Sequence, residues 1–116
     1  MAIESLYSDE LAPWYDLYAY DERLDIHIKF IVRIFKKFRV KKFLDVSCGT
    51  GNYIIPLNKK GFHGVGVDLE PAMVREAQKK SKKQNLKIRF CIHDMRKLSV
   101  KGRYDEIIAP FSGFSY

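Results

Sequence analysis

Apolar and polar residues repeat with two different periods along this chain, and the changes of period predict its elements. Residues 21–38 carry apolar side chains at helical spacing, with Ile28, Ile31, Phe35 and Phe38 at i, i+3, i+7 and i+10. Acidic residues stand in the first turns of this segment and cations in its last turns, which suits the helix dipole. The pattern predicts an amphipathic helix over residues 21–38 that covers one face of a sheet.

Shorter apolar runs follow, each bounded by glycine or by a polar turn. The expected strands are residues 43–46, 64–67, 87–92 and 104–110, and the expected helices are residues 52–60 and 71–84. Pro71 suits the first position of the later helix. Strands that alternate with helices indicate an α/β fold, an open parallel sheet with helices on its faces. Right-handed crossovers from the first strand give the strand order 3-2-1-4.

The stretch from Lys41 to Asp68 is the part of the chain on which this fold depends. It contains a strand, a glycine turn, a helix and a second strand, and the turn Cys48-Gly49-Thr50-Gly51-Asn52 is too small and flexible to continue a strand. Ligands of such sheets bind outside the carboxyl ends of the strands, beside the gap between strands 1 and 4. The residues expected around this crevice are Gly49, Gly51, Asp68, Asp94 and the segment after Ala109.

The glycine turn also indicates what kind of ligand the crevice binds. A dinucleotide fingerprint needs a third glycine, G-x-G-x-x-G, but Gly51 is followed by Asn52-Tyr53-Ile54. Asp45 adds a carboxylate just before the turn, which disfavours a pyrophosphate and favours an ammonium group. No GxxxxGK[ST] motif of a P-loop is present. The turn therefore favours a ligand with an adenosine and a positively charged amino-acid tail.

Composition restricts the class of protein without choosing a function. With 116 residues, 47% of them apolar, the chain is expected to form a single domain over residues 1–116. No apolar run approaches the roughly 20 residues that span a bilayer, so we expect no membrane segment. The first residues show no basic segment followed by an apolar one, so no secretory signal is expected, and the cytoplasm is favoured.

Cysteine spacing and charge exclude some partners. Cys48 and Cys91 form no CxxC pair and the three histidines show no ligand spacing to them, so two free thiols and no metal site are expected. The net charge of +7 comes largely from lysine and arginine in residues 36–42 and 79–89. No aromatic residue alternates with these cations as a base-stacking platform requires. Solvated helix ends explain them better than a nucleic-acid partner does.

Three segments resemble the class I S-adenosylmethionine-dependent methyltransferases: FLDVSCGTGNY, VGVDLEPAMV and CIHDMRKL, in that order. The resemblance implies a Rossmann-like fold with S-adenosylmethionine as cofactor. It also implies that Asp45 holds the ammonium group of the cofactor and that Gly49 and Gly51 let the backbone approach it. Asp68 would accept hydrogen bonds from the ribose hydroxyls.

The resemblance assigns further roles around the adenine. Leu69 and Met73 would flank its faces, Asp94 would accept its amino group, and the Met95 backbone N–H would donate to its ring. Structural alternatives stay open for the acids: Asp68 as an exposed acid at a strand end, Asp94 as a helix cap, and Asp45 as an anchor of the turn backbone.

The aromatic N-terminus, residues 1–20, allows two explanations. Its rings either pack on the surface of the core or form a lid over the ligand. The segment ELAPWYDLYAY resembles the lid of family members that act on small molecules, which would bring Tyr7 and Tyr15 near the methionine end of the cofactor.

The last residues leave the methyl acceptor open. The segment after strand 4, Pro110-Phe111-Ser112-Gly113, is not the N/D-P-P-[YF] motif of amino-group DNA methyltransferases, so a small-molecule acceptor is favoured. No catalytic base is visible, and Asp105 is expected to be structural because it lies at the start of strand 4.

Relative to the family, the chain lacks the usual C-terminal strands and ends after strand 4. A truncated chain, a split enzyme and a homodimer would each explain this. The apolar edge of strand 4 would then pair with a second copy or a partner chain. Two functional hypotheses follow: a methyltransferase, or a non-catalytic or partner-dependent cofactor-binding subunit.

Overall fold

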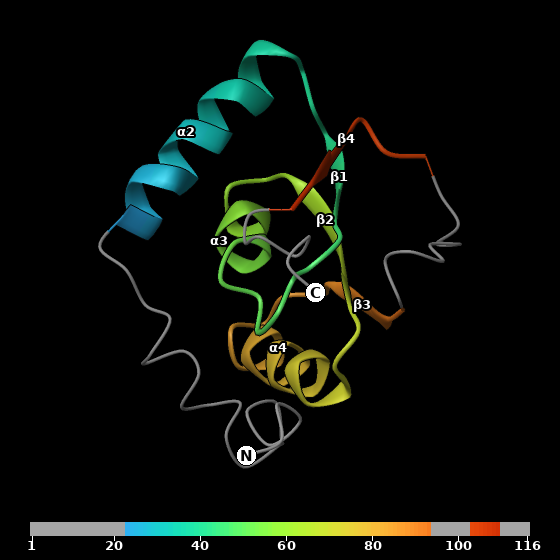
Figure 1. Cartoon of the computed structure of the whole chain (residues 1–116). Helices are drawn as coiled ribbons and strands as arrows, with labels where there is room; N and C mark the ends of the chain where they lie inside the picture. The colour runs from blue at the N-terminus through green and yellow to red at the C-terminus, as the bar shows by residue number, and fades with distance from the viewer. Residues whose placement is uncertain (1–22, 94–102, 110–116) are drawn as a thin grey trace.

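The fold is a four-stranded parallel sheet, shown in Figure 1 as a computed structural model in which residues 23–93 and 103–109 are described. The sheet has the order β3-β2-β1-β4. Its strands are β1 (Lys42–Asp45), β2 (His63–Asp68), β3 (Arg89–Ile92) and β4 (Glu106–Ile108). Both the α/β class and the predicted order 3-2-1-4 are confirmed.

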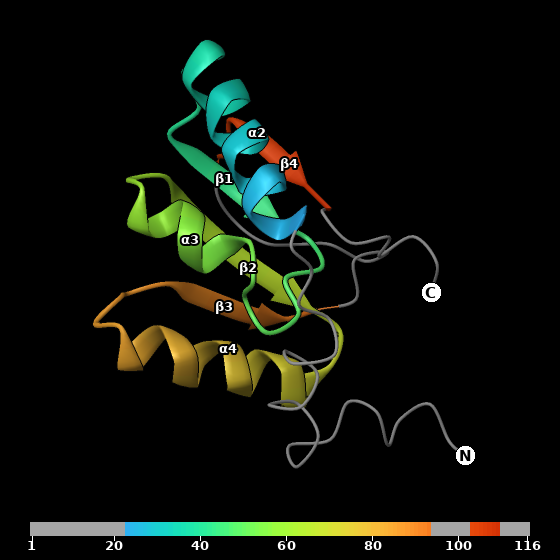
Figure 2. The same cartoon turned by 90° about the vertical axis from the view of Figure 1, so that its left-hand side faces the viewer.

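Figures 1 and 2 show three helices on one side of this sheet. They are α2 (Arg23–Lys37), α3 (Ile54–Lys59) and α4 (Pro71–Lys83). Each described helix lies where the periodicity predicts one, and α3 is shorter than predicted because Asn52 and Tyr53 belong to the turn before it. Strands β3 and β4 are also shorter than the apolar runs that predicted them, because the pairing with neighbouring strands covers only Arg89–Ile92 and Glu106–Ile108.

The helix-covered face holds the larger core. Aromatic rings dominate it, with the ring centroids of Phe35 and Phe43 5.2 Å apart and those of Phe35 and Phe62 also 5.2 Å apart. Burial of each such ring contributes about 2 kcal/mol. The opposite face holds a smaller cluster of Leu44, Val46, Val65 and Val67, against which Cys91 and Tyr104 pack. Neighbouring residues of β1, Phe43 and Leu44, thus enter different cores.

One prediction about α2 is wrong. Ile28 and Phe35 are buried and Ile31 is half-buried, but Phe38, placed by the helical period on the same face, is 67% exposed. The helix ends at Lys37, and Arg39 takes a φ of 56° as the chain turns toward β1. The Phe38 N–H still donates to the Ile34 carbonyl at 3.0 Å, so the residue keeps a helical hydrogen bond, and its ring is exposed at the end of the helix, where the chain leaves for β1.

Glycines in β2 allow α3 and Phe43 to pack directly on the strand. A Cβ added at Gly64 would lie 2.5 Å from Cζ of Phe43 and 2.7 Å from Cγ1 of Ile54. At Gly66 it would lie 2.7 Å from a ring carbon of Phe90. The pattern Gly-Val-Gly-Val therefore gives β2 a helix-facing side without side chains and an opposite side of buried valines.

We expect Gly64→Ala to destabilise the fold by about 2 kcal/mol, because its methyl group overpacks the contact with Phe43 and Ile54. Urea denaturation followed by circular dichroism measures this free energy. The matched control is the double variant Gly64→Ala/Phe43→Leu, in which the smaller side chain makes room for the methyl group. The two substitutions should couple favourably by about 1 kcal/mol. Strict additivity would show that Phe43 is not what excludes the methyl group.

Candidate functional site

The glycine turn lies over the carboxyl edge of the sheet because backbone pairing continues past the end of β1. The Val46 N–H donates to the Ile108 carbonyl at 3.0 Å, and the Cys48 N–H donates to the Val67 carbonyl at 2.9 Å. The chain after β1 is thereby attached to the ends of both neighbouring strands. This places the turn at the crevice that the strand order predicts.

Gly49 and Gly51 serve different purposes in this turn. Both have positive φ, 55° and 90°. A Cβ at Gly51 would lie 2.8 Å from Cδ1 of Ile55, so packing against the start of α3 favours this glycine in addition to its φ. A Cβ at Gly49 would meet no atom within 4 Å. Gly49 therefore leaves open space at the edge, as a residue that lets a ligand approach the backbone must.

Asp68 connects three segments through one carboxylate. Its Oδ2 accepts from the Gly49 N–H at 2.9 Å and its Oδ1 accepts from the Glu70 N–H, also at 2.9 Å. The residue is only 4% exposed, so the alternative of an exposed strand-end acid is wrong. Each carboxylate oxygen can accept a further hydrogen bond, which leaves capacity for a ligand hydroxyl. Burial raises the pKa of Asp68, while these backbone donors oppose the rise.

Asp45 is the second buried acid at this edge, 1% exposed. Its Oδ1 accepts from the Ser47 N–H at 3.3 Å, so the predicted anchoring of the turn backbone is present. Burial, with a smaller contribution from the negative charge of Asp68, raises the pKa of Asp45 to about 7. Among the described residues, no cationic side chain is a cause of the shift at either acid. The edge thus concentrates negative charge, and the described part of the chain places no cation among the causes of either pKa shift.

Cys48 lies in the same turn and is buried. Burial first, and then the negative charges of Asp45 and Asp68, raise the pKa of its thiol well above the usual range. A thiol held in its protonated form is a poor nucleophile, which excludes a covalent role at neutral pH. Cys48 and the half-buried Cys91 are both free, as predicted.

Some of the remaining predicted site residues lie in the described part of the chain, and the others lie outside it. Leu69 follows β2 and is 41% exposed, so a flat ring can lie on it. Met73 lies in the first turn of α4 and is buried, with 2% of its surface exposed. Their contact with adenine stays a prediction. The His93 N–H donates to the Asp68 carbonyl at 3.0 Å, which brings the end of β3 to the site. Tyr7, Tyr15, Asp94 and Met95 lie outside the described residues.

Two contacts to the glycine turn have no signal in the sequence. The Lys80 ammonium donates to Asn52 Oδ1 at 3.1 Å and to Thr50 Oγ1 at 3.4 Å. On the other flank, His27 Nδ1 of α2 lies 2.9 Å from the Tyr53 hydroxyl. All three pairs are at least 26 residues apart, so no local pattern could indicate them.

Asp105, by contrast, is at the opposite edge, as expected. Its Oδ2 accepts from the Lys41 and Lys42 N–H groups at 2.8 and 3.0 Å. These backbone donors lower the pKa of Asp105 and give it a structural role at the start of the sheet.

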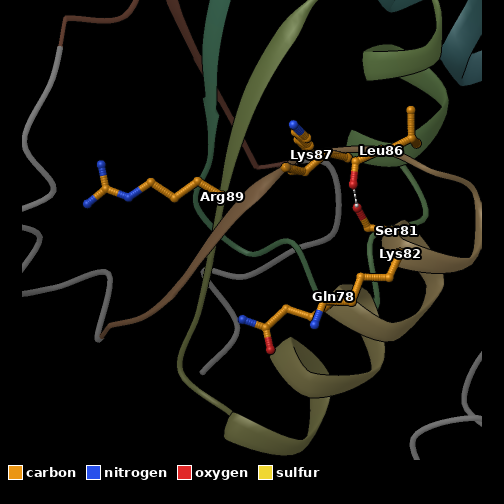
Figure 3. Close-up of a pocket in the computed structure, with 7 residues that line it drawn as sticks. Gln78, Ser81, Lys82, Leu86, Lys87 and Arg89 are labelled. Carbon is orange, nitrogen blue, oxygen red and sulfur yellow. Dashed lines mark hydrogen bonds between the residues drawn. The ribbon is translucent and has the colours of Figure 1, made fainter.

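A basic groove of about 590 Å³ lies away from this site, between the end of α4 and the start of β3 (Figure 3). It is lined by Gln78, Ser81, Lys82, Leu86, Lys87, Ile88 and Arg89. Lys87 and Arg89 point in different directions in Figure 3, so their charges do not converge on one point. Within residues 23–93 and 103–109, no group of histidine, cysteine and acidic side chains could hold a metal ion.

None of the described helices combines the length and the apolar character that crossing a membrane requires.

Comparison with known proteins identifies the family. The family model described as "Methyltransferase domain" matches residues 43–116. A protein of Geobacillus sp. (strain WCH70) that carries a provisional methyltransferase name is 33% identical over 84% of this chain. The glycine/sarcosine N-methyltransferase of Parasynechococcus marenigrum is 28% identical over 89% of it. The chain spans 40% and 37% of the lengths of these two relatives.

Solved structures agree with the family model. A S-adenosylmethionine-dependent methyltransferase from Clostridium acetobutylicum superposes with a TM-score of 0.69 at 29% identity, over 85% of this chain and 42% of that one. A structure from Methanococcus maripaludis reaches 0.78 at 22% identity, over 95% of this chain and 53% of that one, and supports the fold alone. S-adenosylmethionine is thus the cofactor of the family, as predicted. The chain belongs to the methyltransferase domain family with a class I, Rossmann-like fold.

Proposed function

We propose that the carboxyl edge of this sheet binds S-adenosylmethionine, and that the chain is the cofactor-binding part of a methyltransferase acting on a small molecule. The observation that carries the proposal is the pair of buried acids, Asp45 and Asp68, beside the open face of Gly49. No cation in the described part of the chain is among the causes of either pKa shift.

The chemistry of the cofactor matches this arrangement. Its ammonium and sulfonium groups are cationic, and a cation near a buried carboxylate favours the charged form of the acid. Asp45 would hold the ammonium group. Asp68 would accept hydrogen bonds from the ribose hydroxyls through the acceptor capacity that Gly49 and Glu70 leave free. Gly49 would bring the backbone close to the methionine portion.

When bound, S-adenosylmethionine supplies a methyl group on an already activated leaving group. The residues of the chain then contribute mainly by holding the donor in one orientation and by excluding water around it. No general base is assigned, because one is needed only when the acceptor must lose a proton. Tyr15, Asp94 and Met95 would complete the donor site, with Leu69 and Met73 beside the adenine.

Two considerations support a small-molecule acceptor. The sequence after β4 lacks the motif of amino-group DNA methyltransferases. The name of one relative, glycine/sarcosine N-methyltransferase, specifies small amino-acid acceptors, although another relative is named as a 23S rRNA methyltransferase. Because the chain spans about two fifths of the relatives' length, donor binding is the part of the activity that its own residues carry.

A partner-dependent subunit is the second candidate function. The observation that favours it is Ile107 on β4, an edge strand of the described sheet, whose side chain is 56% exposed. An apolar edge strand is a template for another strand, from a second copy or from a partner chain. Methyl transfer that requires an added partner chain would favour this candidate over an enzyme that is active alone.

Titration calorimetry with S-adenosylhomocysteine tests donor binding. We expect the native chain to bind it and Asp68→Ala to raise the Kd at least about 30-fold, because hydrogen bonds to a charged acceptor are lost. Asp105→Asn is the matched control, since it alters an acid at the opposite edge. Folding of each variant is verified by circular dichroism. No heat from folded native protein at millimolar ligand would refute cofactor binding, and an unchanged Kd for Asp68→Ala would refute the ribose assignment.

Affinity for S-adenosylhomocysteine should also depend on pH through Asp45. With a pKa of about 7, this acid is mostly protonated at pH 6 and mostly ionised at pH 8. If its charge holds the ligand ammonium, the affinity should rise about tenfold between these pH values. Asp45→Asn should remove this dependence. A native affinity that is constant from pH 6 to 8 would contradict the role given to Asp45.

The same substitution should stabilise the free protein at high pH. The pKa of Asp45 is higher in the folded chain than its ordinary value of 3.8, so the folded state retains a proton that the unfolded state loses. Stability from this group therefore falls as the pH rises from about 4 to 7 and is lowest above that range. At pH 8, Asp45→Asn should be more stable by on the order of 3 kcal/mol, with little difference at pH 4. Urea denaturation at both pH values measures the difference.

A further inference from the structure

The glycine turn has a flexible backbone around its central residue. Thr50 lies between Gly49 and Gly51, and glycine backbones have more accessible conformations than those of any other residue. The turn is closed by one short backbone bond, from the Gly51 N–H to the Cys48 carbonyl at 2.9 Å. A turn with two glycines needs additional contacts to stay in one conformation.

Helix α4 supplies such contacts from outside the turn. In Figure 1 the segment after β1 descends onto α4. Ala77 is fully buried there, and its Cβ lies 3.6 Å from the position that a Cβ of Gly51 would occupy. Two small residues thus let the helix approach the turn closely.

Lys80 stands one helical turn further along the same face of α4. Its ammonium donates to Asn52 Oδ1 at 3.1 Å and to Thr50 Oγ1 at 3.4 Å. These acceptors lie on both sides of Gly51, so one cation joins the two halves of the turn. Thr50 is 1% exposed, which makes this a contact in the interior rather than on the surface.

We propose that Lys80 is a positioning residue, which holds the glycine turn in the conformation that receives the methyl donor. The proposal rests on the donor-binding function proposed above. It explains why a lysine with a strongly hydrated ammonium group is directed back over the turn, when its neighbours Lys79, Lys82 and Lys83 are exposed or extend from the end of the helix. Lys80 acts through Thr50 and Asn52 and is not required to touch the donor.

Three variants test this role, and Lys80→Met is the first. It keeps most of the aliphatic stem and removes the ammonium. We expect its Kd for S-adenosylhomocysteine to rise about tenfold, the effect of losing about one charge-assisted hydrogen bond. Lys80→Arg, which restores a cationic donor, should recover the native Kd to within about twofold. Lys79→Met is the matched control, because it removes the same charge from an exposed neighbour and should leave the Kd unchanged.

Amide hydrogen exchange of Gly49 and Gly51, followed by NMR, gives a second readout that does not depend on the ligand. Both amides should exchange faster in Lys80→Met than in Lys79→Met, while amides of the sheet centre such as Val65 stay equal. A general loss of stability would accelerate all of them together.

The outcomes separate this proposal from donor binding itself. A native chain that does not bind S-adenosylhomocysteine overturns donor binding and the donor-related role of Lys80. Native binding with an unchanged Kd in Lys80→Met overturns the Lys80 proposal alone. An equal rise of the Kd in Lys79→Met shows a general effect of charge and also overturns it, as does a failure of Lys80→Arg to restore affinity.

Discussion

The carboxylate of Asp68 is the interaction on which the site depends. It ends β2, accepts the N–H of Gly49 across the sheet, and accepts the N–H of Glu70 at the start of α4. A buried carboxylate is costly to desolvate, and charge-assisted hydrogen bonds to backbone donors offset part of that cost. One side chain thereby fixes where the glycine turn lies relative to the second strand. The open face of Gly49 is useful for binding only because this contact sets its position.

The electrostatics of the edge follow from the same burial. Asp45 and Asp68 repel each other, and burial raises the pKa of both. Under the donor role proposed for this edge, a positively charged ligand would relieve the repulsion, and its binding would be coupled to the ionisation of Asp45. Stability given up at a binding site is regained when the ligand occupies it.

The glycine turn depends on contacts from three directions. Asp68 holds it from β2, Lys80 from α4, and the pair of His27 and Tyr53 connects its end to α2. In the donor site proposed above, the described residues would provide the parts that belong to β1, β2 and α4. Acceptor choice is a separate question, since this chain spans about two fifths of the length of the two relatives described above.

The sequence by itself determined the parallel sheet, its order and the location of the crevice, because periods, glycines and crossover handedness are local or topological properties. It also indicated Asp45, Gly49 and Asp68 as residues of one edge, since the carboxyl ends of parallel strands lie together. It failed at Phe38, which the helical period placed in the core although the residue stands exposed just after the end of α2. Only the tertiary structure decided that Asp68 is buried, that Gly51 lies against Ile55 while Gly49 faces open space, and that Lys80 reaches the glycine turn. Each of these depends on how close separate elements come in space. Such distances follow from the packing of the helices on the sheet, and no spacing along the chain records them.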